Sequence, residues 1–240
     1  MLIVVAVVAV VLVAATIVAV VVDTLRADRG PGGDPDAAWT VQVPRDGRSE
    51  AQLEVLDGAT DLQVVAGDLG DQLLRVETPD GGAVRPQVTE SDGTVRVGLA
   101  ETGTGGAGLV EIIVHREVLW SVRVLGGATG QRIDLTAAQV SQVDLAGGTS
   151  TMDLLLPPPN GTVEVRMSGG VSTWRVGVPS QIPVQVRLGS GAGSVTLDDQ
   201  RSDGLGAGET VASPGWDEAT DRYDIDAVAG VSDLTVTRSG

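Results

Sequence analysis

The sequence predicts an all-β protein: a single-stranded β-solenoid, built like a right-handed β-helix, preceded by one N-terminal transmembrane helix. Three observations predict this architecture. The first 22 residues are almost entirely apolar, a glycine-centred pattern recurs along the chain, and the segments around it alternate apolar and polar side chains. The composition agrees, because Phe and Cys are absent and the core must come mainly from Val, Leu and Ile, which suit strands.

The N-terminal segment 1–22 contains Thr16 as its only polar side chain. As a helix it would span roughly 33 Å, which matches a hydrocarbon core of about 30 Å. A cleaved signal peptide is the alternative, but such a peptide has a basic start, a shorter apolar run and a small-residue cleavage site. We therefore predict an uncleaved, single-pass membrane anchor.

The segment 23–49 is expected to be a tether between this anchor and the β domain. It begins DTLRADRGPGGDPDAAW, which has no periodicity, and Trp39 closes that run. Arg26 and Arg29 follow the apolar segment, and the positive-inside rule would place the domain in the cytoplasm. The β domain is expected over residues 50–238.

The repeat has the frame h-x-h-x-x-G-x-x-x-h-x-h, where h is apolar. Its six copies place glycine at the same phase: Gly58, Gly127, Gly148, Gly170, Gly191 and Gly230. The four central copies start 21, 22 and 21 residues apart, which predicts rungs of about 21–22 residues that pair as parallel strands. A β-sandwich with hairpins is the alternative, although it does not need one glycine at the same phase in every unit.

The second position of the frame is charged in every copy: Glu54, Arg123, Asp144, Arg166, Arg187 and Asp226. If the rungs stack in register, Asp144 lies between Arg123 and Arg166. On the next face, Asp153 then lies between Arg132 and Arg175. Such pairs favour the correct register over like-charge stacking.

Two regions break the period. Residues 65–121 alternate like strands of irregular rungs, with ETGTGGAG (residues 101–108) as a loop. Residues 198–221 form an acidic, glycine-rich segment that we expect to be a mobile loop.

The search for chemistry predicts no catalytic, cofactor-binding or metal-binding residue, and therefore no enzyme. His115 is the only histidine, and GGATG lacks the Lys-Ser/Thr pair and the following helix of a phosphate loop. No spacing fixes the geometry of a cation site among the acidic residues Asp198, Asp199, Asp203, Asp217 and Asp221. The net charge of −16 disfavours nucleic acid as a partner.

The run from Trp120 to Asp199 resembles the C-terminal domain of LiaF-type cell-wall-antibiotic-response proteins and related putative-adhesin, or toast-rack, domains. The matching motifs are WSVRVLGGATGQRIDL, VSQVDLAGGTSTMDLLLP, VEVRMSGGVSTWRVGVP and IPVQVRLGSGAGSVTLDD. The resemblance covers about residues 50–238 and implies a non-enzymatic, extracytoplasmic envelope protein. This sequence departs from the LiaF-type regulators in having one visible membrane helix where they have several.

The sequence therefore predicts a membrane-anchored interaction module, in cell-envelope stress sensing or signalling. A sensor kinase, an envelope protein or a second copy of the chain would be its partner. The alternative is a structural, adhesin-like surface protein that binds a polymer or cations through its acidic face.

Overall fold

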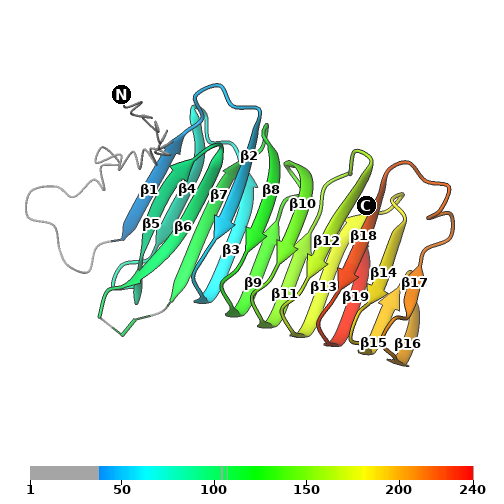
Figure 1. Cartoon of the computed structure of the whole chain (residues 1–240). Helices are drawn as coiled ribbons and strands as arrows, with labels where there is room; N and C mark the ends of the chain where they lie inside the picture. Colours follow the sequence, from blue (N-terminus) through cyan, green and yellow to red (C-terminus); the bar gives the residue numbers. More distant parts are fainter. Residues whose placement is uncertain (1–37, 104, 107, 240) are drawn as a thin grey trace, which may run out of the picture.

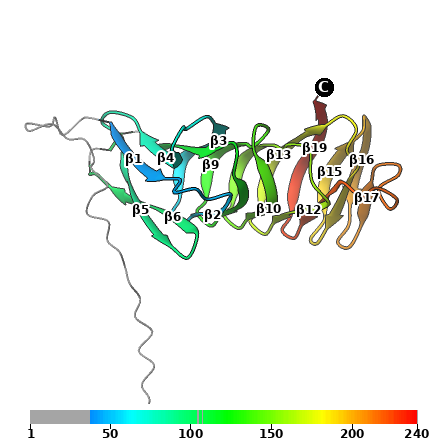
Figure 2. The same ribbon diagram turned by 90° about the horizontal axis from the view of Figure 1, so that it is seen from above.

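The computed structural model describes residues 38–103, 105–106 and 108–239, which form nineteen strands and no helix. The predicted anchor 1–22 lies outside these residues. Within the part that is described, no helix has the length and hydropathy to cross a membrane. The all-β prediction is confirmed, and the strands form two mixed sheets (Figures 1 and 2).

The first sheet has ten strands. In spatial order they are β1 (Trp39–Pro44), β4 (Gln72–Thr78), β7 (Leu109–His115), β3 (Ala59–Gly67), β9 (Ala128–Asp134), β11 (Thr149–Leu155), β13 (Val171–Pro179), β19 (Val231–Ser239), β15 (Ala192–Leu197) and β16 (Gln200–Leu205).

The second sheet has nine strands. In spatial order they are β17 (Thr210–Ala212), β14 (Val184–Leu188), β18 (Arg222–Ala227), β12 (Thr162–Met167), β10 (Gln139–Leu145), β8 (Leu119–Val124), β2 (Glu50–Val55), β6 (Thr94–Glu101) and β5 (Val84–Ser91).

Each copy of the repeat forms one rung, which is a strand of the second sheet, a glycine corner and a strand of the first sheet. The rungs β8–β9, β10–β11 and β12–β13 stack in chain order as parallel strands, and Val143 pairs with both Val122 and Val165. This in-register stacking confirms the prediction for the centre of the molecule.

The order of rungs at the C-terminal end differs from the prediction. The last rung, β18–β19, lies between β12–β13 and β14–β15, although β14–β15 comes first in the chain. The copy at Val186 therefore does not stack on the copy at Val165, which corrects the sequence-based order. At the other end β6 and β7 lie outside β2 and β3. A continuous single-path solenoid is thus not confirmed.

Antiparallel strands close both ends of the sheets. β16 pairs with β15 and β17 with β14, so the acidic segment 198–221 contains two capping strands and the prediction of a mobile loop there is wrong. At the other end β5 pairs with β6, and β1 pairs with β4. β1 lies within the segment expected to be a tether, so the sheet begins at Trp39.

One hydrophobic core fills the space between the two sheets. The strands alternate buried and exposed side chains, as period two requires, and Val163, Val165 and Met167 of β12 face inward. The largest buried side chains are Trp120, Trp174 and Tyr223. The remaining side chains of each strand project outward and define two polar faces.

Candidate functional site

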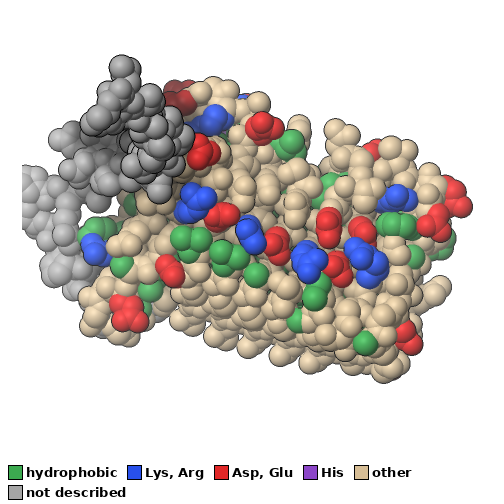
Figure 3. Space-filling model, in the orientation of Figure 1, with side chains coloured by type: hydrophobic (Ala, Val, Ile, Leu, Met, Phe, Trp, Pro, Cys, Tyr) green, Lys and Arg blue, Asp and Glu red, His purple; other side chains and the backbone are tan. Residues whose placement is uncertain are grey.

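The outward face of the second sheet carries a row of seven charges, one on each of seven neighbouring strands. We call this row the charge ladder, and in spatial order it is Arg187, Asp226, Arg166, Asp144, Arg123, Glu54 and Arg96. The sign alternates at every step, and Figure 3 shows blue and red side chains alternating along this face. The predicted position of Asp144 between Arg123 and Arg166 is confirmed.

Several steps of the ladder are ion pairs within the chain. Arg96 Nε lies 2.8 Å from Glu54 Oε2, and Arg123 Nε lies 3.1 Å from Asp144 Oδ2. Arg166 pairs with Asp226 at 3.3 Å. The pairs hold neighbouring strands in register, although exposed pairs of this kind contribute only about 1 kcal/mol or less each.

Arg187, at the end of the ladder, forms its ion pair with a residue of β18 that lies outside the ladder. Its guanidinium donates to both carboxylate oxygens of Asp224, at 3.0 and 3.1 Å. This hydrogen bonding raises the pKa of Arg187 above its ordinary value.

The face of the first sheet carries a shorter alternating row. Asp153 pairs in register with Arg132 and Arg175, as the sequence predicted. Arg175 lies 3.3 Å from Asp153, whereas Arg132 turns to Asp134 of its own strand at 3.1 Å.

The same face is polar near its C-terminal end. Asp233 accepts a hydrogen bond from Ser194 Oγ at 2.5 Å and contacts Arg201 at 3.3 Å. The hydrogen bond from Ser194 is the main cause that lowers the pKa of Asp233. This carboxylate therefore serves contacts between strands.

Two large apolar side chains are exposed beside the charge ladder. Leu56 and Leu125 are 39% and 37% exposed and are the only large hydrophobic side chains so exposed among the described residues. They follow β2 and β8, which are neighbours in the sheet, and Leu125 N–H donates to Val55 at 2.8 Å. Each stands two residues beyond a ladder residue, so the two leucines lie side by side along the same edge of the face.

The corner GGATG is a structural joint between rungs. Ala59 N–H donates to Gly127, and Ala128 N–H donates to Gly148, at 3.1 and 3.2 Å. Similar bonds link the later corners, so the corner backbone bonds to its neighbours and does not form a phosphate cradle.

The glycine most tightly confined at these corners precedes the one that defines the repeat. A Cβ on Gly147 would stand 2.1 Å from the Gly126 carbonyl oxygen, whereas a Cβ on Gly148 would stand 3.5 Å from its nearest neighbour. The repeat pattern identified the corner correctly but selected the less demanding of its two glycines.

A hollow of about 570 Å³ lies at one end of the row of corners, bordered by Gly58, Thr60, Thr129 and Glu101. Its lining is glycine, alanine, valine and threonine apart from Glu101. One carboxylate without a base or a second acid offers no catalytic pair.

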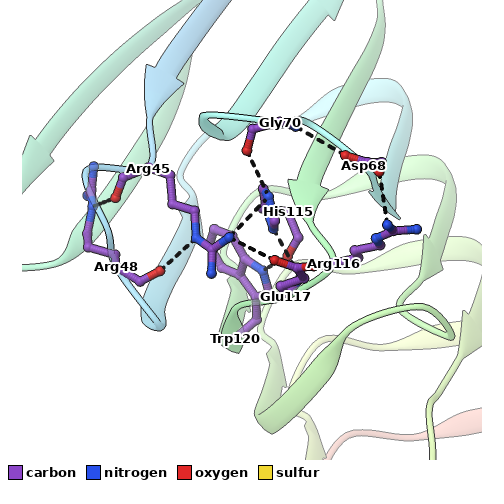
Figure 4. A network of polar contacts seen from close by, with 8 residues as sticks. All are labelled: Arg45, Arg48, Asp68, Gly70, His115, Arg116, Glu117 and Trp120. Carbon is purple, nitrogen blue, oxygen red and sulfur yellow. Dashed lines mark hydrogen bonds and ion pairs between the residues drawn. The ribbon is translucent and has the colours of Figure 1, made fainter.

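His115 belongs to a network that joins three turns (Figure 4). His115 is 3% exposed, its Nδ1 accepts from Glu117 N–H at 3.0 Å, and Nε2 lies 3.1 Å from the Gly70 carbonyl. Neutral His115 therefore carries its proton on Nε2 and donates it to Gly70.

Arg45 and Trp120 complete this network. Arg45 Nη1 donates to Glu117 Oε2 at 3.0 Å, and Trp120 Nε1–H donates to the His115 carbonyl at 2.9 Å. Every polar atom of the imidazole is thus committed to holding turns together. No nucleophile stands beside it in the network.

The acidic residues of segment 198–221 are dispersed. Asp198 pairs with Arg238, Asp203 pairs with Arg201 at 2.8 Å, and Asp221 accepts from Gly161 N–H at 2.7 Å. Over residues 38–239, apart from 104 and 107, no group of three or more Asp, Glu, His or Cys side chains could hold a metal ion. The sequence could not predict how these acidic residues are distributed, because their partners depend on which arginines the fold brings close to each carboxylate.

No protein-family model and no curated protein matches the chain. Among solved structures, a "putative cell adhesion protein" from Clostridium sporogenes superposes with a TM-score of 0.60 at 16% identity, covering 83% of this chain and 99% of that one. A "putative adhesin" from Bacteroides fragilis covers 83% of this chain and 97% of that one at 11% identity, but its TM-score of 0.28 carries no argument. The first likeness shows a shared fold and agrees with the resemblance to adhesin-type domains; the LiaF-type resemblance is not confirmed.

Proposed function

We propose that this chain is a non-enzymatic, adhesin-like interaction module, held at the cell envelope by segment 1–22 and exposed outside the cytoplasm. The observation that carries the proposal is the charged face of the second sheet. It offers an extended, regular surface, whereas the described residues bring no catalytic pair together. The fold shared with a putative cell adhesion protein supports the same class.

The form of the surface favours a macromolecular partner over a small ligand. Seven charges follow one another across strands that are regularly spaced by about 4.8 Å, so the face is long and polar. A small molecule needs a concave pocket that removes most of its surface from water. An extended face with alternating charge instead suits a partner with a repeating or complementary surface.

A topology experiment tests the anchor and the side of the membrane together. Alkaline phosphatase fused after Gly240 should be active in cells, and the fusion should remain in the membrane fraction after carbonate washing. A matched fusion lacking residues 1–22 should lose both properties. An active cytoplasmic reporter in place of the phosphatase would overturn the extracytoplasmic, adhesin-like proposal.

A role in cell-envelope stress is a second candidate, supported by the resemblance of the Trp120–Asp199 run to LiaF-type proteins. Deletion of the chain should then change the induction of an envelope-stress reporter by cell-wall antibiotics. Complementation with the full chain should restore the response, and complementation without residues 1–22 should not. An unchanged dose response in the deletion strain would remove this candidate.

A further inference from the structure

The alternating charges of the ladder allow two copies of this face to be complementary to each other. A two-fold axis parallel to the strands would lay a second copy of the chain against this face with its rungs in reverse order. Because the signs alternate at every step, an axis between two rungs brings opposite charges together at every facing position. An axis through a rung would bring like charges together. The face is therefore complementary to itself in one family of arrangements.

The exposed leucines select one member of that family. Leu56 follows β2 and Leu125 follows β8, and these strands are neighbours. A two-fold axis between β2 and β8 places Leu56 of one copy on Leu125 of the other, and the reverse contact forms by symmetry. The same axis sets Arg123 against Glu54 and Asp144 against Arg96.

The shape of the ladder fits this arrangement. Arg96 and Arg123 keep 39% and 46% of their side chains exposed, although each already has a partner within the chain. Glu54 and Asp144 are only 12% and 19% exposed. The arginines thus project from the face and the carboxylates are recessed, so an arginine of one copy can seat above a carboxylate of the other.

The ends of the sheets are poor sites for self-association. Antiparallel strands cap both ends, and the edge strand β5 contains Pro86, which cannot donate a backbone hydrogen bond. A second copy is therefore better accommodated on the face than at an edge.

We propose that the charged face of the second sheet is a two-fold interface between two copies of this chain, with the axis between β2 and β8. The inference rests on the proposed interaction function, and its tests do not depend on the side of the membrane. Leu56 and Leu125 supply the apolar centre of the interface, and the alternating charges specify its register.

Charge reversal tests the register. The full chain in detergent should sediment as a dimer, and Arg123→Glu should shift it to monomer because Glu would then face Glu54 twice. The double reversal Arg123→Glu with Glu54→Arg should restore the dimer, since the facing pair is again opposite. A monomeric parent chain, or a folded double variant that remains monomeric, would overturn the proposal.

Thermal unfolding of the same variants separates the interface from the fold. In the double variant the neighbouring positions 123 and 54 again have opposite signs within one copy. Glu at 123 still lies beside Asp144 and Arg at 54 beside Arg96, so two intramolecular contacts of the ladder remain unfavourable. We expect recovery of the dimer at fixed detergent and salt while the unfolding temperature, measured on dilution to monomer, stays below that of the parent. Simultaneous recovery of both would indicate that the charges act only within the chain and would count against the interface.

Cross-linking provides a test that does not need charge reversal. The chain has no cysteine, so a single introduced thiol can be joined only to another chain. Chains carrying Leu56→Cys and Leu125→Cys, co-expressed in cells, should be joined to each other by a short thiol-reactive cross-linker. Gln63→Cys, which lies on β3 of the opposite sheet, is the control. A mixed yield no higher than that of the control would contradict the proposed interface.

Discussion

The central rungs and the C-terminal rung obey the same repeat but are placed by different rules. From β8 to β13 each rung stacks on the one before it in the chain. The rung β18–β19 instead enters between β12–β13 and β14–β15, which leaves β14–β15 beside the capping strands. The repeat therefore determines the form of a rung but not its position in the stack.

The charge ladder indicates which interaction favours the observed order of the rungs in the stack. If β14 stacked directly on β12, Arg187 would stand beside Arg166. The inserted strand β18 places Asp226 between them. At the other end β2 places Glu54 between Arg96 and Arg123 in the same way. Like charges side by side on paired strands are unfavourable, and both departures from chain order avoid such a pair of arginines.

The corners also differ between the two regions. The central corners have glycine before the repeat glycine, at Gly126, Gly147 and Gly169, where an added Cβ would meet backbone atoms of the preceding rung at 2.0 to 2.4 Å. The inserted rung has Ala229 at this position, and a Cβ on Gly230 would meet nothing within 4 Å. The central stack is thus more closely joined and should tolerate less change.

The largest expected loss of stability is in the core of the central rungs, and the corresponding loss in the C-terminal cap should be smaller. Trp174→Ala should destabilise the protein by about 3–5 kcal/mol, because it empties a fully buried site in β13. Trp216, in the loop after β17, is only partly buried, so Trp216→Ala should cost less. Chemical denaturation measures both free energies of unfolding, and equal losses would contradict the distinction.

The glycine corners give the next largest contrast. Gly147→Ala should lower the free energy of unfolding by about 2–3 kcal/mol, because neither of the facing backbones can move without shifting a rung. The change Gly230→Ala, at the repeat glycine of the inserted rung, should cost less than about 0.5 kcal/mol, because an added Cβ there meets nothing within 4 Å. Thermal and chemical unfolding of the pair would test this, and a Gly147→Ala protein as stable as the parent would refute the packing argument.

The inserted rung should respond to alkali. Tyr223 of β18 is buried and its hydroxyl donates to the Pro157 carbonyl at 2.7 Å, and burial raises the pKa of this phenol above its ordinary value. The folded state therefore keeps a proton that the unfolded state loses. Stability should be unaffected by this group below about pH 10 and fall by about 1.4 kcal/mol per pH unit above it, until the folded pKa is reached.

The composition makes this alkaline response easy to assign. Tyr223 is the only tyrosine, and the chain has neither Lys nor Cys. Tyr223→Phe should lose about 1 kcal/mol at neutral pH with the hydrogen bond, and its stability should no longer decline near pH 11. Phenolate absorbance that developed near pH 10 in the folded parent would contradict the burial argument.

The smallest expected effect tests the charge-based placement itself. Asp226→Arg would line up three arginines across β14, β18 and β12, and should destabilise the protein by about 1 kcal/mol at low salt. Added salt should recover much of this loss by screening. Asp226→Asn, which removes attraction without adding repulsion, should cost less, and equal effects of the two changes would argue against placement by charge.

Much of the fold could be predicted from the repeat. The alternation of side chains identified the strands and their inward faces, and the common phase of the copies predicted the register that places Asp144 and Asp153 between arginines. The signs at the second position of the frame also carried information on rung order. Part of that signal lies within the six copies, because Arg166 and Arg187 are consecutive in the chain and have the same sign. The order at the other end requires Arg96 of β6, which lies outside the six copies.

The candidate site was less accessible to sequence reasoning. The pairing of Asp198 with Arg238, and of Arg187 with Asp224, joins residues that no local pattern connects. The exposure of Leu56 and Leu125 likewise depends on which strands become neighbours. From the sequence alone, an exposed leucine that follows a strand cannot be told apart from a buried one.

By itself the sequence determined the units: strands of period two, glycine corners, and rungs that pair in register, because these follow from side-chain alternation and local backbone sterics. Only the tertiary structure decided that the last rung enters the stack before its end, that segment 198–221 caps both sheets, and that β1 joins the first sheet. The physical reason is that all the rungs present similar edges. The choice among them therefore depends on charges, corner packing and chain connections that meet only in the folded molecule.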